Sequence, residues 1–573
     1  MKTLLNYLKP YYFRMFAGFL IKTTGTVAEL MLPFILSHIL SNVIEKSVKE
    51  IIYWGLLMVV FAAIAWILNV IANRMAAFVS RNFTEGIRKD LFKKTLNLSA
   101  SQTDKFTIPS LESRITTDTY NVHHFVNMMQ RMGIRAPILL IGGVAITLIM
   151  DASLSLVMII LLPIIFAVVY FIRLKGIPLY KKVQQSVDGM IRVVREDSQG
   201  IRVIKALSKT DYEHKRYDIV NKKLINDETK AGITMGLVNP VMTFFMNLGS
   251  VAVIVIAASR IADNLSNPET VIAFIQYFTQ ISMAMMTVTR MFVMYTKCSA
   301  SASRIEEVLL TEEEIFVCSE KDYPDKDTLS HILFDNVTFS YNKKRDNLKN
   351  INFEIPKGGS LGIIGATGSG KSTIIKLLLR FYDIEKGGIY INGKNIKTIE
   401  KSEFYKMFGS VLQNDFLYSD TIMENIKFGR DISDENVKKA AKIAQADDFI
   451  TAFKNGYNHI LSQHGTNISG GQKQRVLIAR ALAGNPEILI LDDSSSALDY
   501  KTDSLLRTAL KENMKETTLI TVAQRVSSVK DCGIIIVLED GKINGIGTHT
   551  ELLKNCTIYK EISDSQAGGA FVD

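Results

Sequence analysis

A glycine-rich stretch between Gly365 and Thr373 has the residue pattern of a phosphate-binding loop. It reads Gly-Ala-Thr-Gly-Ser-Gly-Lys-Ser-Thr and fits G-x-x-x-x-G-K-[ST], with a strand-like run before it and a helix-like run behind it. Glycine lets the backbone curl so that several N–H groups point inward, and the helix N-terminus adds partial positive charge. Lys371 can then reach the β- and γ-phosphates while the Ser372 hydroxyl holds Mg²⁺. The stretch therefore predicts that the chain binds a nucleoside triphosphate.

Two stretches downstream of this loop also place polar groups where a phosphate or a metal could be held. Ser469-Gly470-Gly471-Gln472 opens a helix-like run, and such a start predicts a second anion cradle. The run 488–491 is uniformly apolar, as in a buried strand, and it is followed by Asp492 and Asp493. A carboxylate at this position can hold Mg²⁺, and we expect Asp492 to do so.

Polar residues at three other strand ends complete the candidate site. The alternating run 332–341 ends at Tyr341, whose ring could stack on an adenine, and the run 411–413 ends in Gln413, which could meet the Mg²⁺. The apolar run that begins at Thr518 ends in a polar tip, Gln524-Arg525. These patterns together predict an α/β P-loop NTPase domain.

The first 300 residues have a different character, because they contain long apolar runs. Of the whole chain, 47% of residues are hydrophobic and 22% are charged, and the apolar ones concentrate in this part. A bilayer core requires about 20 apolar residues per helix. The runs predict six membrane-spanning helices, at about 12–40, 51–77, 136–150, 154–172, 235–258 and 271–294.

Charge and cysteine content indicate how this chain is placed in the cell. The net charge is +10, and basic residues cluster between apolar runs at 81–94 and 175–230. Positive charge beside membrane spans favours the cytosolic side and is a better explanation here than nucleic-acid binding. The four cysteines have no CxxC spacing, which predicts neither a metal site nor a disulfide framework. We expect a multi-pass protein whose nucleotide domain is cytoplasmic.

The chain divides into three parts on composition. We expect an all-α membrane domain over residues 1–305, an acidic and polar linker over 306–330, and the nucleotide-binding domain over 331–573. Within the first predicted span, Glu29 is the most deeply placed ionisable residue. It predicts a substrate contact, a bond between helices or a water-lined surface.

The motif order resembles that of an ATP-binding cassette (ABC) domain. Tyr341, GATGSGKST, Gln413, ISGGQ, ILILDD and SALD occur in the order of that family, and six spans precede them. The chain therefore resembles a half-transporter of the ABC exporter type over nearly its whole length. In this family two cassettes sandwich two ATP molecules, each between the phosphate loop of one chain and the SGGQ segment of the other. The resemblance thus implies a dimer.

The resemblance also assigns roles to residues. It implies ATP contacts from Tyr341, Gly365, Thr367, Gly368, Ser369, Gly370, Lys371, Ser372, Thr373 and Gln413; Mg²⁺ contacts from Ser372, Gln413 and Asp492; and contacts to the partner's ATP from Ser469, Gly470, Gly471 and Gln472. Two polar helical regions, around Ser113–Asp118 and Gly200–Ala206, resemble the segments around the two elements that couple the membrane helices to the cassettes.

Two catalytic positions depart from the family pattern. The family usually has Glu directly after the Mg²⁺ aspartate, where it orients the attacking water, and this chain has Asp493. It usually has His at the last strand tip, in contact with the γ-phosphate, and this chain has Gln524. Both positions serve the ATP of this chain's own phosphate loop. The SGGQ segment and the 496–499 loop keep the pattern, while Ser462-Gln463 replaces the usual Gly-Glu before the signature.

These departures predict a heterodimer. The chain resembles the degenerate-site subunit of bacterial heterodimeric multidrug exporters, in which its own site would turn over slowly and its SGGQ segment would complete an active site with a different half-transporter. The alternatives are a homodimeric exporter with slow ATPase and an ATP-binding regulatory subunit. We expect ATP and Mg²⁺ as cofactors, a bacterial plasma membrane as the location, and amphipathic drugs or lipids as cargo. The absence of an appended peptidase before the first span disfavours a peptide exporter that trims its cargo.

Overall fold

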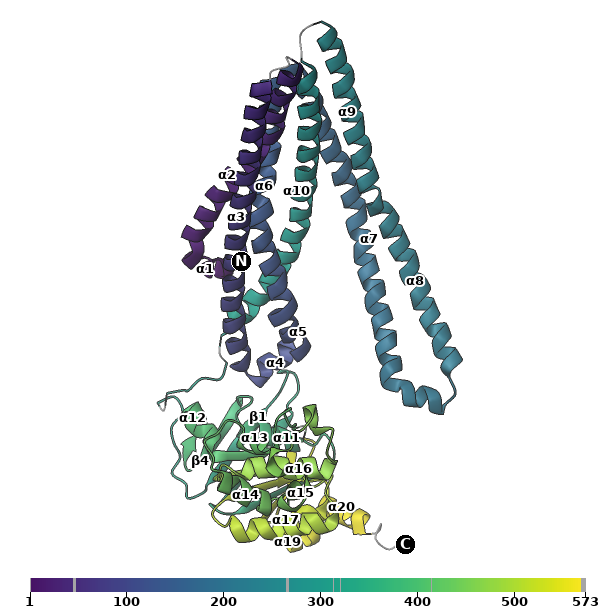
Figure 1. Ribbon diagram of the computed structural model, residues 1–573. Helices are drawn as coiled ribbons and strands as arrows, with labels where there is room; N and C mark the ends of the chain where they lie inside the picture. The colour runs from purple at the N-terminus through teal and green to yellow at the C-terminus, as the bar shows by residue number, and fades with distance from the viewer. Residues whose placement is uncertain are drawn as a thin grey trace. The chain divides into compact units, whose positions relative to one another are not determined.

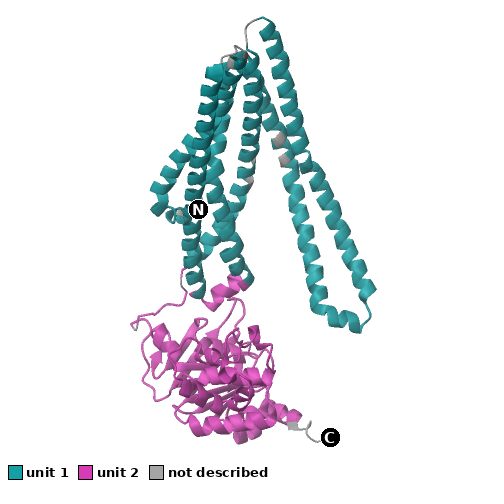
Figure 2. Cartoon of the chain, in the orientation of Figure 1, with its two compact units in different colours: residues 1–96, 109–311 teal, residues 97–108, 312–573 magenta. Residues whose placement is uncertain are grey.

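The structure, a computed structural model, describes residues 2–44, 48–263, 267–312, 314–319, 321–413 and 415–567. The chain forms two compact units, coloured separately in Figure 2. Unit 1 comprises residues 1–96 and 109–311, and unit 2 comprises residues 97–108 and 312–573. A short segment from the first third of the chain therefore belongs to the same unit as the nucleotide-binding motifs.

Unit 1 is helical throughout its regular structure (Figure 1). Its elements are α1 (Lys2–Asn6), a 3-10 turn (Lys9–Tyr11), α2 (Tyr12–Ile44), α3 (Val48–Leu96), α5 (Ile108–Ser113, whose first residue falls in unit 2), a π-helical turn (Arg114–Asp118), α6 (Thr119–Met150), α7 (Ala152–Ala206), α8 (Thr210–Gly236), α9 (Val238–Ala262) and α10 (Pro268–Leu309).

Among the described residues, six helical stretches are long and apolar enough to cross a membrane, which confirms the six predicted spans. They are Thr3–Ser41, Val48–Leu96, Ile108–Met150, Ala152–Ala206, Thr210–Ala262 and Pro268–Leu309. The longest has 55 residues, and at 1.5 Å per residue it measures about 80 Å. A bilayer core is about 30 Å thick, so these helices extend well beyond it.

The helices of unit 1 pack in two sets. In Figure 1, α2, α3, α6 and α10 lie side by side, and α7 packs with α8 and α9. A buried cluster of apolar residues joins α2, α6, α7, α9 and α10. Within it, the fully buried Tyr277 of α10 donates a hydrogen bond to the Leu30 carbonyl of α2, at 2.6 Å. This bond lies one turn before Pro33, which interrupts the hydrogen-bond ladder of α2.

Glu29 of α2 is paired with a neighbouring helix. Its carboxylate accepts hydrogen bonds from both the Nε and Nη2 groups of Arg135 on α6, the former at 3.1 Å. A bond between helices, one of the interpretations drawn from the sequence, is therefore present at Glu29.

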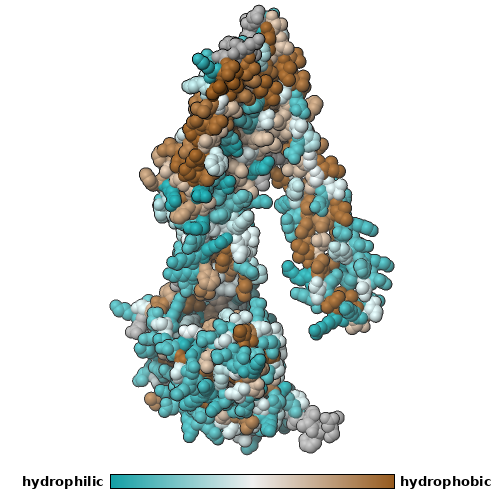
Figure 3. Space-filling model, in the orientation of Figure 1, coloured by the Kyte–Doolittle hydropathy of each residue, from teal (hydrophilic) through white to brown (hydrophobic). Residues whose placement is uncertain are grey.

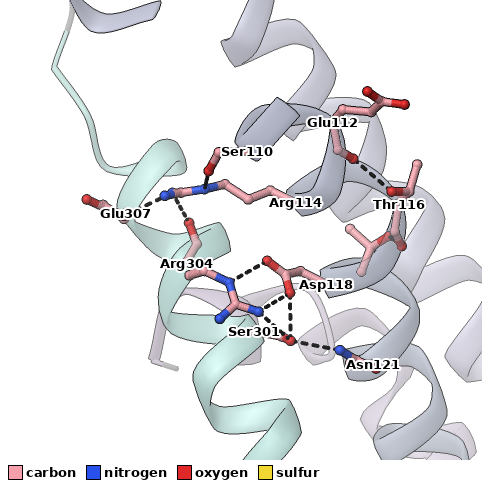
Figure 4. Close-up of polar contacts among 10 residues, drawn as sticks. Ser110, Glu112, Arg114, Thr116, Asp118, Asn121, Ser301, Arg304 and Glu307 are labelled. Carbon is pink, nitrogen blue, oxygen red and sulfur yellow. Dashed lines mark hydrogen bonds and ion pairs between the residues drawn. The ribbon is translucent and has the colours of Figure 1, made fainter. Parts of the chain in front are cut away.

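A network of charged residues joins the start of α6 to the end of α10 (Figure 4). The Asp118 carboxylate is fully buried and accepts hydrogen bonds from Ser301 and Arg304. The buried Arg114 guanidinium donates to the Arg304 carbonyl at 2.6 Å and forms an ion pair with Glu307 at 2.9 Å. Ser113–Asp118 therefore belongs to a continuous helix that is bound to the base of α10.

The first turn between long helices lies earlier than Ser113–Asp118. After α3 ends at Leu96, Ser99 and Gln102 form a capping box at the start of α4 (Ala100–Phe106), and Thr107, at φ 62°, separates α4 from α5. The second region, Gly200–Ala206, forms the last turns of α7. It precedes a turn at Ser208, which has φ 51°.

Unit 2 contains two sheets. The antiparallel sheet has the order β2-β1-β4-β5 and the other has the order β10-β9-β3-β8-β7-β6. The strands are β1 (Ile332–Phe339), β2 (Leu348–Ile355), β3 (Ser360–Gly365), β4 (Lys386–Ile391), β5 (Lys394–Asn395), β6 (Phe408–Val411), β7 (Ile488–Asp492), β8 (Thr518–Val522), β9 (Ile534–Glu539) and β10 (Lys542–Gly547). In the larger sheet β10 runs antiparallel to β9 and the other strands are parallel.

Helices surround these sheets. They are α4, α11 (Lys371–Leu378), α12 (Lys401–Phe404), α13 (Ile422–Lys427), α14 (Asp434–Ile443), α15 (Asp447–Ala452), α16 (Gly470–Leu482), α17 (Tyr500–Asn513), α18 (Val526–Val529), α19 (His549–Asn555) and α20 (Thr557–Ala567). Every residue of β7 is buried, as the uniformly apolar run 488–491 predicts. The α/β character predicted for this part of the chain is confirmed.

The region expected as a linker, 306–330, is not uniform. Its first residues continue α10 to Leu309, because Ile305 and Val308 continue the buried face of that helix. Farther along, the buried guanidinium of Arg380 donates to the Phe316 carbonyl at 2.8 Å. This part of the linker is therefore attached to unit 2.

Candidate nucleotide-binding site

The candidate site lies where parallel strands of the larger sheet end. Because β3, β6, β7 and β8 run in the same direction, the residues that follow them gather at one edge of the sheet. A pocket at this edge is lined by Asn347, Thr367, Gly368, Gly370, Lys371, Ser372, Thr373, Gln413, Asp492, Asp493, Val522, Ala523 and Gln524. The structure thus brings together the phosphate loop and the polar residues that follow three other strands, the farthest of which in sequence is Gln524.

The phosphate loop follows β3 and leads into α11. Gly368 and Gly370 have φ angles of 85° and 107°, which side chains other than glycine rarely adopt. A Cβ at Gly370 would also lie 2.7 Å from the Leu348 side chain. The Lys371 ammonium donates to the carbonyls of Gly365 and Ala366, both at 2.8 Å, and its burial lowers its pKa. The lysine is thus held over the loop by carbonyl groups.

The loop also offers a hydroxyl group that lacks a partner. The Ser369 hydroxyl is buried and makes no hydrogen bond with the described residues. A buried hydroxyl without a partner costs free energy, and a phosphate oxygen would supply the acceptor that it needs. This feature, together with Lys371 and the α11 N-terminus, fits a bound nucleotide phosphate.

Two carboxylates at the end of β7 stand beside the loop. Asp492 is 5% exposed, and its Oδ1 lies 3.5 Å from the Ser372 hydroxyl. Asp493 has φ 53° and donates its backbone N–H to the Val522 carbonyl at 2.9 Å. Burial raises the pKa of both carboxyl groups. Asp492, Ser372 and Gln413 all line the pocket and offer oxygen ligands of the kind that Mg²⁺ prefers.

Replacing the buried Asp492 by asparagine is expected to stabilise the nucleotide-free protein. Its pKa is raised on folding, so the folded chain binds this proton more tightly than the unfolded chain. Stability is therefore lost as pH rises above the ordinary carboxyl range, and an amide has no such loss. A gain of about 1 kcal/mol would raise the melting temperature of a domain of this size by about 2–4 °C.

Differential scanning fluorimetry at neutral pH would measure this change. The Asp492→Asn chain should melt higher without nucleotide and should lose the further increase that Mg²⁺ adds to ATP. Thr502→Ala, at an exposed helix start outside the pocket, is a control that should retain the Mg²⁺ effect. A lower melting temperature for Asp492→Asn would show that desolvation is not the dominant effect.

Gln524 is positioned by a residue that the sequence did not identify. Gln566 of α20 donates its side-chain amide to the Gln524 carbonyl at 2.9 Å and accepts the Val526 backbone N–H at 2.8 Å. The two bonds fix the backbone on both sides of the tip that follows β8. No sequence signal identifies Gln566, because it lies 42 residues from Gln524 on a helix without a motif.

Loss of this double hydrogen bond is expected to loosen the strand tip. Gln566→Leu preserves the size of the side chain and removes both bonds, each of which contributes about 0.5–1.5 kcal/mol. We expect ATP to bind about three- to tenfold more weakly to the chain, which equilibrium binding of a fluorescent ATP analogue would measure. Ser565→Ala, on the neighbouring exposed position of α20, should bind as the parent does. Equal affinity for the Gln566→Leu chain would exclude this positioning role.

The SGGQ segment forms the start of α16. Ser469 and Gln472 make a capping box, in which the Ser469 hydroxyl accepts the Gln472 backbone N–H at 3.2 Å. A Cβ at Gly471 would lie 3.0 Å from the Ala497 carbonyl, so the segment is closely packed against the 496–499 loop. None of Ser469, Gly470, Gly471 and Gln472 lines the pocket that contains Lys371. The segment thus lies apart from the pocket that contains Lys371.

Tyr341 also lies outside the lining of that pocket, but it is next to the phosphate loop. Its ring is 42% exposed, and its hydroxyl donates to Thr373 at 3.3 Å. The Tyr382 ring meets it edge-on, with centroids 5.0 Å apart, and the Tyr382 hydroxyl donates to Asp104 of α4 at 2.5 Å. Burial raises the pKa of that hydroxyl. The Tyr341 ring therefore contacts a residue that is hydrogen-bonded to α4.

Further contacts hold α4 within unit 2. The Ser99 hydroxyl donates to Glu314 at 2.7 Å, and the Gln102 amide donates to the Glu312 carbonyl at 2.7 Å. Sequence reasoning placed a coupling element near Ser113–Asp118. The structure identifies α4 as the segment that joins the nucleotide-binding unit, and the Ser99–Gln102 capping-box pattern is the signal that could have revealed it.

Comparison with known proteins places the chain in a family. Residues 15–285 match the model of the ABC transporter transmembrane region, and residues 348–496 match the ABC transporter model. The chain is 33% identical over 572 residues to YfiB of Bacillus subtilis, an uncharacterized ABC transporter ATP-binding protein, and the match covers 99% of each. It is 35% identical over 486 residues to a second such protein of that organism, YknU, with 84% of this chain and 82% of YknU covered.

A solved structure agrees with this relationship at the level of the fold. A bacterial Atm1-family ABC exporter with ATP bound superposes with a TM-score of 0.78, at 24% identity, over 97% of this chain and 98% of that one. The membrane helices of unit 1 and the ATP-binding cassette of unit 2 both match family models. The chain belongs to the ABC transporter family and has the half-transporter architecture, in which an N-terminal transmembrane domain precedes a C-terminal ABC ATPase domain with the fold of an ABC exporter.

Proposed function

We propose that this chain is one subunit of a heterodimeric ABC exporter and that its own phosphate loop builds a low-turnover ATP site. The observation that carries the proposal is that Asp493 and Gln524 line the same pocket as Lys371. Both residues depart from the family pattern and both serve one nucleotide. Two departures at one site are more simply explained by a site that has lost fast hydrolysis than by two unrelated changes.

The residues of this pocket are suited to hold Mg-ATP. Lys371 and the α11 N-terminus neutralise phosphate charge, and Ser372, Gln413 and Asp492 hold the metal. Mg-ATP supplies the phosphoanhydride bond and the charge that closes two cassettes on each other. The Asp493 carboxylate is one methylene shorter than glutamate, so it lies farther from a water at the γ-phosphate. Gln524 can donate a hydrogen bond there but carries no titratable proton.

The second site would be completed by this chain's signature segment. Ser469–Gln472 lies apart from the chain's own pocket, and its capping box presents the α16 N-terminus outward as an anion cradle. We propose that it covers an ATP held by the phosphate loop of a different half-transporter that carries Glu and His at the two catalytic positions. Closure of the cassettes would switch the membrane domains between inward- and outward-facing states, which would export amphipathic drugs or lipids across a bacterial plasma membrane with both cassettes in the cytoplasm.

Coexpression with a half-transporter that carries Glu and His at the two catalytic positions tests this proposal. The pair should copurify, hydrolyse ATP, and drive ATP-dependent uptake of an amphipathic dye into inside-out vesicles. This chain alone should hydrolyse ATP slowly. A brisk ATPase and dye uptake by the chain alone would establish a homodimeric exporter instead. Hydrolysis by the pair without any uptake would favour a regulatory subunit.

A further inference from the structure

A cluster of cations lies between helices α2, α3 and α6 of unit 1. The Lys22 side chain is 4% exposed, and its ammonium donates to the amide oxygens of Asn69 at 2.6 Å and Asn73 at 3.2 Å. Arg131 of α6 donates to the same Asn73 oxygen at 3.1 Å. Two cations therefore converge on one neutral amide oxygen.

The cluster contains too little negative charge to balance these cations. Within the part of the chain that the structure describes, neither Lys22 nor Arg131 forms an ion pair with a carboxylate. Glu29 is the nearby carboxylate, and Arg135 already binds both of its oxygens. Asparagine contributes dipoles but no charge, so two positive charges remain uncompensated. Lys22 is buried, whereas Arg131 is exposed. A buried charge such as that of Lys22 is costly without a counter-ion, which favours recruitment of an anion, and the exposed Arg131 is accessible to one.

The surroundings of this cluster are apolar. Lys22 follows the start of α2 by ten residues, about 15 Å along the helix. Large apolar side chains are exposed on all three helices within three residues, in sequence, of a member of the cluster: Leu20 on α2 (49%), Trp66 on α3 (69%) and Met132 on α6 (47%). Figure 3 shows apolar side chains gathered over part of the helices of unit 1. The members of the cluster all belong to helical stretches that are long and apolar enough to cross a membrane.

We propose that Lys22, Arg131 and Arg135 form a binding site for the anionic head of an amphiphile, a phosphate or carboxylate that carries an alkyl chain. The cations would bind the head group, and the exposed apolar side chains would contact the alkyl chain. A free phosphate ion would gain nothing from the apolar surroundings. An acidic phospholipid of the membrane has the same anionic head and alkyl chain as an amphiphilic cargo. The inference therefore rests on the proposed export function only if the bound amphiphile is cargo.

Glu29 has a defined place in this site. Its carboxylate engages Arg135 and competes with an incoming anion for that guanidinium. The site therefore makes an unusual prediction, because removing a charge at Glu29 should strengthen ligand binding while removing one at Lys22 should weaken it. A purely structural role for the cluster would make both substitutions harmful.

Tryptophan fluorescence can measure this binding in the full-length chain. The chain has two tryptophans, and Trp66 lies one helical turn before Asn69 on α3. In a Trp54→Phe chain reconstituted in phosphatidylcholine nanodiscs, a brominated alkyl phosphate should quench Trp66 at lower concentration than the brominated alcohol of equal length. Neither a partner subunit nor ATP is needed, so failure of the proposed heterodimer would leave this test unaffected.

Variants of the cluster test whether its cations bind the phosphate head. Lys22→Met and Arg131→Gln should each weaken binding of the alkyl phosphate about tenfold, a factor that corresponds to about 1.4 kcal/mol, and leave the alcohol unchanged. Glu29→Gln should strengthen binding of the alkyl phosphate. Arg74→Gln, at an exposed position of the same helix α3, is the matched control and should change neither. Equal binding of phosphate and alcohol, or equal shifts of both in the Lys22 variant, would overturn the proposal.

The lipid composition of the nanodiscs distinguishes the two possible sources of the anionic head, a membrane phospholipid and an exported cargo. If an acidic phospholipid occupies the site, phosphatidylglycerol added to the nanodiscs should compete with the alkyl phosphate in the parent chain and not in Lys22→Met. If the site instead receives cargo, phosphatidylglycerol should not compete. Both results support an anion site and differ only in which amphiphile fills it.

Discussion

The chain that carries both Asp493→Glu and Gln524→His is expected to hydrolyse ATP about 100-fold faster at its own phosphate loop than the parent chain. Both side chains line the pocket that contains Lys371. Lengthening the carboxylate by one methylene moves its oxygens by about 1 Å, and a misplacement of that size can cost about 100-fold in rate. Histidine adds a titratable donor beside the γ-phosphate, which glutamine lacks.

The backbone at these two positions supports the exchange. Asp493 has φ 53° and its N–H is bonded to the Val522 carbonyl, so the direction of its side chain is set by β7 and β8 rather than by the carboxylate itself. The Gln566 amide holds the backbone of position 524 in the same way. Since neither anchor uses the side chain that is exchanged, the longer carboxylate and the imidazole should occupy the same directions as the residues they replace.

Single variants and a charge-removing variant are the controls. The chain alone, at concentrations where its own Ser469–Gln472 segment can complete the site, should show small gains for either single exchange and a larger one for both together, since both act on one phosphate. Asp493→Asn should change the slow turnover of the parent little. A strong loss with Asp493→Asn, or no gain with the double exchange, would mean that the parent site is already competent.

The parts of this site that the sequence predicted share one physical origin. A buried parallel strand has a continuous apolar pattern, and the residue after it must lie at the carboxyl edge of the sheet. The runs that end before Gly365, Gln413 and Asp492 could therefore be assembled into one pocket without knowledge of the connections. Six apolar runs were equally informative, because a bilayer sets the length that a helix must have.

The contacts that the sequence did not reveal depend on side chains far apart in the chain. Asp104 and Tyr382 are separated by 278 residues, and neither belongs to a periodic pattern or a motif. The membership of 97–108 in unit 2 follows from such contacts and not from composition. The cluster around Lys22 shows the same limit, because a lysine within an apolar run predicts a polar function but does not reveal which helices supply Asn69, Asn73 and Arg131.

A change at the signature segment should act on the partner's ATP site, whereas the exchange at Asp493 and Gln524 acts on this chain's own ATP site. In the purified pair of half-transporters, Gly471→Asp in this chain is expected to lower ATP hydrolysis by about 1,000-fold, the scale on which loss of a preorganised anion donor acts. Lys371→Met in the same chain should cost only a few-fold, because most turnover would take place at the partner's phosphate loop.

The structure gives two reasons for the large effect of Gly471→Asp. A Cβ at this position would lie 3.0 Å from the Ala497 carbonyl, so a side chain forces the α16 start and the 496–499 loop apart. The added carboxylate would also lie at the helix N-terminus that we propose binds a phosphate of ATP. Repulsion between the carboxylate and this phosphate would oppose ATP binding. Gly456→Asp is the matched control, since a Cβ at Gly456 meets no atom within 4 Å and aspartate tolerates its φ of 50°.

Comparison of these three variants in one assay separates the two ATP sites. ATP hydrolysis by the pair should fall strongly with Gly471→Asp, fall slightly with Lys371→Met and stay unchanged with Gly456→Asp. If Lys371→Met proves as harmful as Gly471→Asp, this chain's own phosphate loop carries much of the turnover, and the two sites work alike. The predicted order instead requires that the phosphate loop of this chain mainly holds nucleotide, while its Ser469–Gln472 segment takes part in hydrolysis at the other site.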